Sequence, residues 1–334
     1  YFPIARLGFK DTAMKVMVTG ANGFVGRALC AHLRAANHQL VAMLRTPASL
    51  AEAPFAHNLA LAEVIVGDLA DGAPLQASLS GVDTVIHLAA RVHIMRDDSP
   101  DPMAAFHQVN VDGTMHLAKQ AHQAGVRRLV FLSSIKVNGE SGHFTETDNP
   151  APTDAYALSK WQAEQALKEF SQQTGMEVVI IRPPLIYGPG VKGNFASLIR
   201  LIQRGWPLPL GAVHNQRSLI ALDNLVSFIA LCADRDQSPA AANQTFLLSD
   251  GADVSTTQLL QKLGQAYGKR PWLIPMPTGL MRLAARLIGK KSVADRLFDS
   301  LTVDSGKAQG LLAWRPVVTM DQQFAKMAMA DSGG

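Results

Sequence analysis

Short apolar runs alternate with helical patterns along the first half of the chain. Runs rich in β-branched residues predict strands at 16–19, 39–44, 64–66, 84–88, 129–133 and 178–182. Apolar positions with helical spacing predict helices between some of them, at 24–36, 103–123 and 156–173. Strands that alternate with helices form a parallel sheet covered on both faces. We therefore expect an α/β fold, a Rossmann-type doubly wound sheet of about six or seven strands.

The pattern becomes irregular after Pro183, where turn-forming residues interrupt the alternation. Later patterns predict short strands near 218–221 and 245–248, and helices near 195–203, 224–232, 256–267, 279–288 and 320–330. We expect a Rossmann domain over residues 14–183 and a smaller mixed α/β lobe over 184–334, partly interleaved with it. Residues 1–13 are interpreted as a leader or an extension outside the fold.

Composition narrows the class of protein. The 334 residues are 48% hydrophobic and 17% charged, which is enough apolar surface for a large core. Two distant cysteines exclude a disulfide framework, and no histidine pair has metal-ligand spacing, so we expect a cytoplasmic protein without a metal. The net charge of +4 comes without a basic strip for nucleic acid, and no apolar run reaches the ~20 residues of a membrane span. Basic positions 282, 286, 290 and 291 are interpreted as a solvated helix face rather than a membrane or anion patch.

A glycine-rich segment, TGANGFVG, links the first predicted strand to the first helix. Gly20, Gly23 and Gly26 allow a tight turn, close approach to a pyrophosphate and close packing of helix on strand. The helix N-terminus adds free amides and a positive dipole. We predict a dinucleotide site here, with an ordinary strand-to-helix turn as the alternative. Its expected contacts are Gly20, Asn22, Gly23, Phe24, Val25 and Gly26.

The end of the second strand indicates which dinucleotide is bound. An NAD site usually carries an acidic residue about 20 positions after the glycines, but this segment reads LRTP. Arg45 could instead bind the 2′-phosphate of NADP, so NADP(H) is favoured and NAD(H) is the alternative; Arg45 could also be merely solvent-facing. Asp68 follows the third strand and could accept a hydrogen bond from the adenine amino group or cap a helix.

A candidate acid/base pair opens the helix predicted at 156–173. Tyr156 and Lys160 are four residues apart and therefore share one helix face. A nearby ammonium lowers the pKa of a phenol, which would make Tyr156 a usable general acid/base near neutral pH. Ser133 and Ser134 end the preceding strand, where a hydroxyl could hydrogen-bond the same substrate oxygen.

Taken in order, these segments resemble the extended short-chain dehydrogenase/reductases, and among them the nucleotide-sugar epimerases, dehydratases and reductases of the NAD-dependent epimerase/dehydratase type. The resemblance implies a Rossmann domain, a C-terminal lobe that binds a nucleotide sugar, and often a homodimer. It spans most of residues 15–226. The matching segments are TGANGFVG at Thr19, GDL at Gly67, HLAA at His87, VNVDGT with Asn110, FLSSIKVNG at Phe131, YALSK at Tyr156, RPPLIYGPG at Arg182 and RSLIALDNLV at Arg217.

The resemblance also implies roles for single residues. Tyr156 is matched to the catalytic acid/base, Lys160 to the residue that tunes it and binds the nicotinamide ribose, and Ser134, rather than Ser133, to the hydroxyl partner. Asn194 and Arg217 are matched to positions that hold the nucleotide diphosphate of the substrate, with loop capping or surface ion pairing as the alternative. The remaining expected cofactor contacts are Leu69, Leu88, Ala89, Ala90 and Pro183, besides Tyr156 and Lys160.

Two departures from the family pattern favour one reaction. Sugar 4,6-dehydratases carry Asp-Glu directly after the catalytic hydroxyl, where this chain has Ile135 and Lys136, so dehydration is disfavoured. Arg45 replaces the acidic residue usual in 4-epimerases, and LRTP is similar to NADPH-dependent reductases such as dihydroflavonol reductases. We therefore predict an NADPH-dependent 4-ketoreductase of a UDP-linked 4-keto-6-deoxy-hexose. The alternatives are a UDP-hexose 4-epimerase with bound NAD and a hydroxysteroid- or dihydroflavonol-type reductase.

Overall fold

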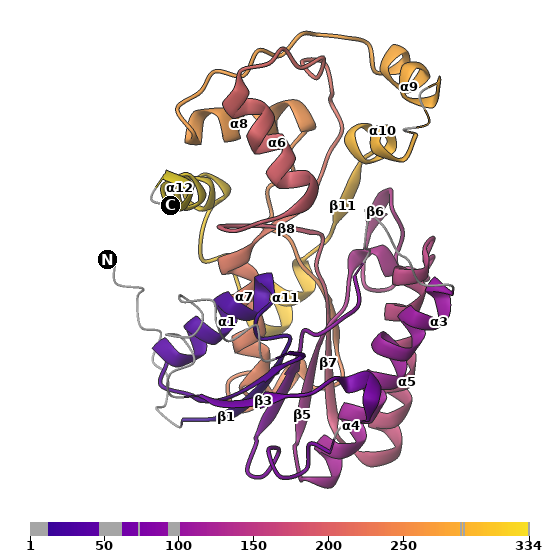
Figure 1. Ribbon diagram of the computed structural model, residues 1–334, viewed down its shortest axis with the longest axis vertical. Helices are drawn as coiled ribbons and strands as arrows, with labels where there is room; N and C mark the ends of the chain where they lie inside the picture. Colours follow the sequence, from indigo (N-terminus) through magenta and orange to yellow (C-terminus); the bar gives the residue numbers. More distant parts are fainter. Residues whose placement is uncertain are drawn as a thin grey trace.

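Seven parallel strands form the main sheet of the computed structural model, which describes residues 13–46, 62–72, 74–92, 101–287, 289 and 291–332. Their spatial order is β3-β2-β1-β4-β5-β7-β10 (Figure 1). This is the doubly wound order expected of a Rossmann fold, so the predicted fold class is confirmed. The strands are β1 (Lys15–Thr19), β2 (Gln39–Leu44), β3 (Glu63–Val66), β4 (Thr84–His87), β5 (Arg128–Leu132), β7 (Glu177–Arg182) and β10 (Thr245–Leu247).

Helices cover both faces of this sheet because successive strand residues point to opposite sides. Val16 and Val18 of β1 belong to a core shared with α1 (Phe24–Ala35), α7 (Leu222–Ala233) and α11 (Gly306–Leu312). Met17, between them, belongs to the opposite core with α4 (Gly113–Gln123) and α5 (Ala155–Thr174). Both faces are therefore apolar, which explains the nearly continuous hydrophobic strands in the sequence.

The strand order reverses at β1, which pairs with β2 on one side and with β4 on the other. At such a switch point the connections after adjacent strands turn to opposite faces and leave a crevice at the carboxyl ends. The glycine turn follows β1, and residues 88–90 follow β4. The predicted cofactor residues of both segments therefore lie at one position in the fold.

A second lobe lies above the sheet in Figure 1 and contains two small parallel sheets. In these sheets β8 (Leu185–Tyr187) pairs with β9 (Leu219–Ala221), and β6 (Gly142–Phe144) pairs with β11 (Leu301–Val303). Tyr187 packs in the core of this lobe with its ring centroid 4.9 Å from that of Phe324. The helices of the lobe are α6 (Gly193–Arg204), α8 (Thr256–Ala266), α9 (Thr278–Leu287), α10 (Lys291–Phe298) and α12 (Met320–Ser332).

Segments after residue 183 interleave with the main sheet: the strand expected near 245–248 joins it beside β7, and α7 packs on it. Two other features differ from the sequence-based expectation. The helix expected over 103–123 is divided into α3 (Pro102–His107), a π-helical turn (Gln108–Asp112) and α4. The three-residue strands β6 and β11 and the helices α10 and α11 were not expected, because such short segments show little periodicity. Residues 1–12 of the expected leader lie outside the described residues.

The sequence has no apolar run long enough to span a membrane, and the helices that the structure describes can be checked for the same property. None of them is both long and apolar enough to cross a bilayer. The longest helix among them, α5, has 20 residues but carries charged side chains along its length.

Candidate active site

The turn between β1 and α1 is built by glycines that no larger residue could replace without strain. Gly20 has a φ of +67°, and a Cβ there would lie 2.8 Å from the backbone nitrogen of Ala89. A Cβ at Gly26 would lie 2.2 Å from the carbonyl oxygen of Gly20. Gly20 therefore allows close approach to the segment after β4, and Gly26 allows α1 to pack directly on the turn.

The N-terminus of α1 fits the phosphates of a dinucleotide. Gly23 is the N-cap residue, is exposed, and makes no side-chain cap hydrogen bond, while the first turn carries no acidic residue. The helix amides and dipole are thus left open to an anion. Of the predicted contacts, Phe24 and Val25 begin the helix, and the carbonyl of Asn22 accepts a 2.8 Å hydrogen bond from Nε of Arg27.

The segment after β4 is held against this turn by hydrogen bonds. The amide of Leu88 donates to the carbonyl of Thr19 over 3.3 Å, and the amide of Ala89 donates to Oγ1 of Thr19 over 3.3 Å. Leu88, Ala89 and Ala90 are all partly buried. The structure thus brings these predicted cofactor residues beside the glycines.

Two predicted specificity residues end the neighbouring strands. Arg45 directly follows β2 and is exposed, so its side chain can reach a ligand from solvent; Pro47 of the LRTP segment lies outside the described residues. Asp68 follows β3 and accepts a 3.0 Å hydrogen bond from the amide of Ala70, which is the helix-capping role considered from the sequence. A contact between the second carboxylate oxygen of Asp68 and adenine stays a prediction. Leu69, the next residue, is buried.

The hydroxyls of Ser134 and Tyr156 interact, although the residues are 22 positions apart in the sequence, because Ser134 acts to lower the pKa of the phenol. Ser134 follows β5, and its Oγ accepts the amide of Lys136 at 3.3 Å, which leaves the hydroxyl hydrogen free to point elsewhere. Tyr156 lies in the first turn of α5. The N-cap residue of this helix is Asp154, whose carboxylate accepts a 2.7 Å hydrogen bond from the amide of Ala157. The carbonyl of Pro183 accepts the amide of Ile135 at 3.0 Å and holds the end of β7 beside this pair.

The neighbouring serine has a different task. Ser133 is buried and donates a 2.5 Å hydrogen bond to the carboxylate of Glu164. That carboxylate, fully buried on α5, also accepts Nε of Arg182 at 2.9 Å. Because Ser133 is committed to this ion pair, the structure brings Ser134 and not Ser133 to the phenol.

The expectation about the pKa of Tyr156 was wrong for the structure as it stands. Burial and the negative charge of Asp154 raise the pKa of Tyr156 to about 12, against which the hydrogen bond from Ser134 acts. The ammonium of Lys160 lies over the ring of Phe131, 3.9 Å from its centroid. Burial lowers the pKa of Lys160 to about 7, opposed by the charge of Glu164 one turn further along α5.

His87, the last residue of β4, is a buried residue whose contacts sequence reasoning missed. Its Nδ1 lies 2.7 Å from Oγ1 of Thr19, and its Nε2 lies 2.9 Å from Oγ1 of Thr114. The hydroxyl of Thr114 donates to the carbonyl of Asn110 at 2.7 Å, so the threonine must accept from Nε2 and the imidazole carries its hydrogen there. Burial and the charge of Lys160 lower the pKa of His87 to about 3. The ring is a neutral link between β1 and α4.

Asn110 connects the same region to the catalytic helix. Its amide nitrogen donates to Oγ of Ser159 at 2.9 Å, and the hydroxyl of Ser159 donates to the carbonyl of Tyr156 at 2.8 Å. The π-helical turn that contains Asn110 therefore fixes the backbone of the first turn of α5. The VNVDGT segment was the available signal, but its spacing does not reveal the partners.

The two predicted substrate residues lie in the lobe. Arg217 is partly buried and donates to the carbonyl of Asp299 at 3.2 Å; burial lowers its pKa, while Asp299 and Glu140 act in the opposite direction. Glu140 also pairs with Lys136 at 3.0 Å, two residues after Ser134. Arg217 is therefore within electrostatic reach of the segment that follows Ser134. Asn194 lies exposed in the first turn of α6, and its contact to a diphosphate stays a prediction.

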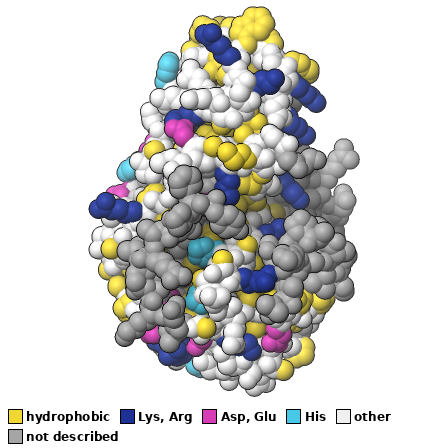
Figure 2. Space-filling view, turned by 90° about the vertical axis from the view of Figure 1, so that its left-hand side faces the viewer, with side chains coloured by type: hydrophobic (Ala, Val, Ile, Leu, Met, Phe, Trp, Pro, Cys, Tyr) yellow, Lys and Arg dark blue, Asp and Glu magenta, His cyan; other side chains and the backbone are white. Residues whose placement is uncertain are grey.

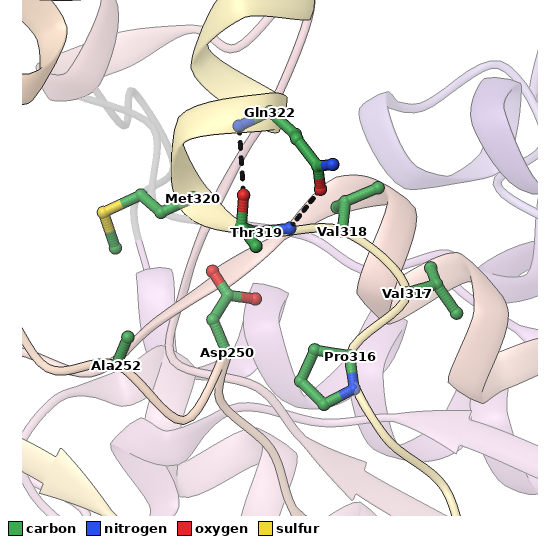
Figure 3. Close-up of a pocket in the computed structure, with 8 residues that line it drawn as sticks. All are labelled: Asp250, Ala252, Pro316, Val317, Val318, Thr319, Met320 and Gln322. Atoms are coloured by element: carbon green, nitrogen blue, oxygen red, sulfur yellow. Dashed lines mark hydrogen bonds between the residues drawn. The ribbon is translucent and has the colours of Figure 1, made fainter. Parts of the chain in front are cut away.

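Other residues of the matched segments are structural. Tyr187 donates a 2.6 Å hydrogen bond to Asp250, whose other oxygen accepts from Asn224 at 2.7 Å. Asn224 in turn accepts the amides of Val317 and Val318. Figure 3 shows Asp250 facing the segment that contains Val317 and Val318, at a small pocket of about 200 Å³. The aspartate joins β8, α7 and the start of α12, and its polar atoms are already engaged within the protein. Among the described residues there is no cluster of three or more potential metal ligands.

Comparison with protein families and curated proteins identifies the family. The model of the NAD dependent epimerase/dehydratase family matches residues 16–244. A UDP-glucose 4-epimerase of Vibrio cholerae is 40% identical over 328 residues, which are 97% of this chain and 97% of that protein. An N-acetyl-α-D-glucosaminyl-diphospho-ditrans,octacis-undecaprenol 4-epimerase of Escherichia coli O157:H7 is 32% identical over 68% of this chain and 69% of that protein.

Solved structures share the fold. A crystal structure of the Thermotoga maritima UDP-glucose 4-epimerase with UDP-glucose superposes with a TM-score of 0.76 at 21% identity and covers 96% of this chain and 99% of that one. The complex of MoeE5 with UDP-glucose and NAD has a TM-score of 0.73 at 26% identity and covers 96% of this chain and 99% of that one. Both the sheet and the lobe of this chain therefore have counterparts in these proteins.

Proposed function

Because this chain belongs to the NAD-dependent epimerase/dehydratase family, we propose that it is an oxidoreductase acting at C4 of a nucleotide-linked hexose, as an NADPH-dependent 4-ketoreductase of a UDP-4-keto-6-deoxy-hexose. The observation that carries the proposal is the placement of Ser134 next to Tyr156, at the same carboxyl edge of the sheet as the glycine turn. A phenol and a hydroxyl together can bind one carbonyl oxygen and supply its proton.

The residues of the chain divide the work at that oxygen. When bound, a nicotinamide dinucleotide supplies the hydride chemistry. Tyr156 donates its phenolic proton to the oxygen at C4 as negative charge develops there, and the hydroxyl of Ser134 hydrogen-bonds the same oxygen. The buried ion pair of Glu164 and Arg182 holds the part of α5 that carries Lys160.

Arg45 favours the reductase. It is exposed at the end of β2, and its guanidinium suits the 2′-phosphate of NADPH. Tyr156, whose pKa is raised to about 12, is protonated at neutral pH and can donate that proton to a ketone oxygen.

A UDP-hexose 4-epimerase with bound NAD is the second candidate, favoured by the relative that is 40% identical over nearly the whole chain. In that reaction Tyr156 would first take the proton of the C4 hydroxyl and later return it. Arg217 and Asn194 would hold the UDP group in either case, which argues against a hydroxysteroid- or dihydroflavonol-type reductase. A cytoplasmic homodimer remains the expectation from the family resemblance.

One set of binding measurements separates these candidates. The purified protein is denatured, any released nucleotide is identified by mass, and the cofactor-free form is titrated with NADPH, NADH and UDP. Tighter NADPH binding that weakens selectively in Arg45→Ala supports the reductase. Stoichiometric NAD that does not exchange supports the epimerase, and a protein that does not bind UDP supports the apolar substrate.

Turnover then decides the reaction. We expect NADPH oxidation with a UDP-4-keto-6-deoxy-hexose and no interconversion of UDP-glucose and UDP-galactose without added cofactor. The reverse pattern would overturn the reductase in favour of the epimerase.

A further inference from the structure

The far end of the C-terminal lobe exposes large apolar side chains on consecutive segments. Between α8 and α9 the chain is extended, and Trp272, Ile274 and Met276 are 63%, 38% and 37% exposed. These are alternate positions, which share one side of an extended segment. The segment is fixed in place, because the amide of Leu208 donates to the carbonyl of Trp272 and the amide of Ile274 donates to the carbonyl of Leu208, both at 2.8 Å.

The helix that follows also exposes apolar side chains. Leu280, Leu283 and Leu287 of α9 are 61%, 56% and 80% exposed, and their spacing of three and four residues places them on one helix face. Two other residues hold α9 to the protein: Met281 is buried, and Arg282 pairs with Asp299 of the segment after α10 at 2.6 Å. The six exposed residues of the extended segment and α9 are called the apolar face below.

Basic residues are frequent in the segment that carries the apolar face, and the acidic residues that contact α9, Asp295 and Asp299, are paired with Arg282. Residues 254–294 contain seven lysines and arginines and no aspartate or glutamate. Lys269 and Arg270 are exposed and line an open cleft of about 910 Å³ together with Trp272. Arg286 is exposed on α9 beside the leucines. Figure 2 shows hydrophobic and basic side chains gathered at the upper end of the lobe, whereas most acidic ones lie lower.

We propose that the apolar face docks the protein on the surface of an anionic phospholipid bilayer. Exposed leucines on one helix face with basic residues at its edge are typical of helices that lie in the membrane interface, and tryptophan favours the headgroup level. Lys269, Arg270 and Arg286 contact the lipid phosphates, each adding electrostatic attraction to an anionic surface. Docking of this kind needs no membrane-spanning helix and does not depend on the reaction proposed above.

The charge of the surface selects this occupant over a second copy of the chain. A symmetric contact would place the same basic residues of both copies opposite each other, which is unfavourable. An anionic bilayer instead complements the exposed Lys269, Arg270 and Arg286, whereas Asp295 and Asp299 are paired with Arg282. The sequence favoured a solvated helix face, because the outward direction of Leu280, Leu283 and Leu287 is visible only in the folded lobe.

Vesicle flotation with the full chain tests the proposal. We expect the protein to float with vesicles of phosphatidylglycerol and phosphatidylethanolamine at low salt, and to bind vesicles of phosphatidylcholine at least tenfold more weakly. Leu283→Glu and Arg270→Glu should each reduce binding to the anionic vesicles at least tenfold. Met329→Glu is the matched control, because Met329 on α12 is 75% exposed outside the apolar face, and it should bind like the wild type.

Several results would overturn the proposal. One is absence of flotation with anionic vesicles, and another is equal loss of binding in Leu283→Glu and Met329→Glu. If light scattering gives a dimer that Leu283→Glu converts to a monomer while vesicles are not bound, the occupant is a second copy. Circular dichroism and the Tm of each variant ensure that lost binding is not lost folding.

Discussion

The two ends of the main sheet each hold an arginine–glutamate pair, and the glutamate is buried at the carboxyl end but partly exposed at the amino end. At the amino end, Arg128 begins β5 and pairs with Glu177 of β7 at 2.8 Å. At the carboxyl end, Arg182 ends β7 and pairs with Glu164 of α5. Both guanidinium groups are almost completely buried. The chemistry of the two pairs is the same, so their different roles come from position in the fold.

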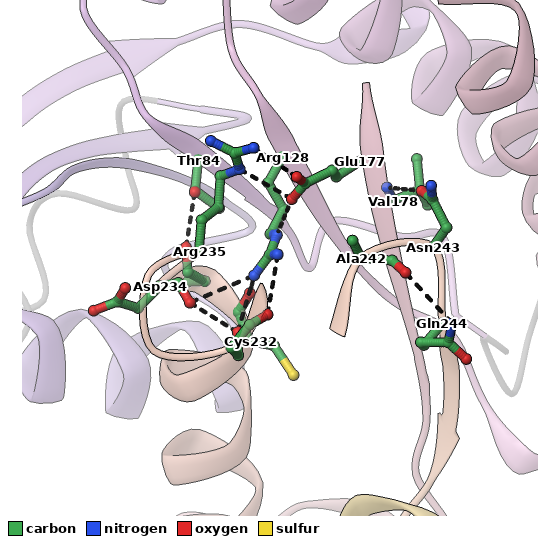
Figure 4. A network of polar contacts seen from close by, with 12 residues as sticks. Thr84, Arg128, Glu177, Val178, Cys232, Asp234, Arg235, Ala242, Asn243 and Gln244 are labelled. Atoms are coloured by element: carbon green, nitrogen blue, oxygen red, sulfur yellow. Dashed lines mark hydrogen bonds and ion pairs between the residues drawn. The ribbon is translucent and has the colours of Figure 1, made fainter. Parts of the chain in front are cut away.

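The amino-end pair joins the sheet to the end of α7 (Figure 4). Arg128 donates to the carbonyl of Cys232 at 2.9 Å and to Oγ of Ser238 at 2.9 Å, while Arg235 adds two further hydrogen bonds to Glu177. The described hydrogen bonds of the Arg128 guanidinium therefore go to groups of the protein itself. This end supports the fold.

The carboxyl-end pair lies beneath the candidate active site. Glu164 follows Lys160 by one helical turn and Tyr156 by two, and it also accepts the hydroxyl of Ser133. In doubly wound sheets ligands bind outside the carboxyl ends of the strands. A buried ion pair at that end can therefore serve chemistry as well as stability, whereas the same pair at the other end serves stability alone.

The largest effect should come from a change that acts only on chemistry. Tyr156→Phe removes the proton donor and should reduce kcat by roughly 10²–10⁴-fold. Because the ring stays packed, cofactor affinity and Tm should remain close to those of the wild type. Steady-state kinetics, nucleotide titration and thermal melting measure the three quantities, and full turnover in this variant would falsify the proposed mechanism.

Matched substitutions at the two ends test the comparison directly. Arg182→Met leaves the buried Glu164 without its partner and should lower the free energy of unfolding by about 3–5 kcal/mol. Arg128→Met leaves Glu177 paired with Arg235 and should cost about 1–3 kcal/mol, because the buried carbonyls lose their donor. Arg182→Met should also lower kcat per folded molecule, because Glu164 positions the helix of Lys160. Urea unfolding measures the stability of each variant. Its kcat is measured under conditions in which both variants are folded to the same extent. Equal kcat in both variants would contradict the distinction between the ends.

The two ends should also differ in the pH range over which they contribute to stability. The pKa of His87, at the carboxyl end, is about 3 in the folded protein, below its usual value, so only the unfolded chain binds this proton between about pH 6.5 and pH 3. Stability from His87 is therefore present above about pH 6.5 and is lost as pH falls, by up to about 1.4 kcal/mol per pH unit.

At the amino end, Arg235 and Arg128 lower the pKa of Glu177 despite partial burial, so its contribution is lost only below about pH 4.3. His87→Gln should flatten the stability curve between about pH 6.5 and 4.5, whereas Glu177→Gln should leave that interval unchanged. Urea unfolding as a function of pH measures both. If the free energy of unfolding of His87→Gln still changes with pH in this interval, another group titrates there.

The smallest effect should come from the exposed edge of the amino-end pair. Arg235 is 29% exposed, and Arg128 continues to pair with Glu177 without it. Arg235→Ala should cost about 0.5–1 kcal/mol of unfolding free energy and leave turnover unchanged. Urea unfolding resolves this difference from the larger loss in Arg128→Met, and similar losses in both would mean that the buried guanidinium is not the dominant partner.

Part of the candidate site could be predicted because it depends on contiguous sequence. The glycines between β1 and α1 and the pair Tyr156 and Lys160 were recognised from spacing, and their helices and strands lie within two residues of the expected bounds. The roles of His87 and Glu164 could not be predicted. Their partners come from β1, α4 and β7, which are adjacent only after the sheet has formed.

The sequence by itself determined the doubly wound sheet, the dinucleotide turn and the presence of an acid/base helix, because periodicity and glycine placement act through the local backbone. The tertiary structure decided which of two adjacent serines contacts Tyr156, and it raised rather than lowered the pKa of that phenol. It also placed β10 in the main sheet and left the leucines of α9 outside the core. Burial and long-range pairing depend on contacts between distant segments, and no local pattern records them.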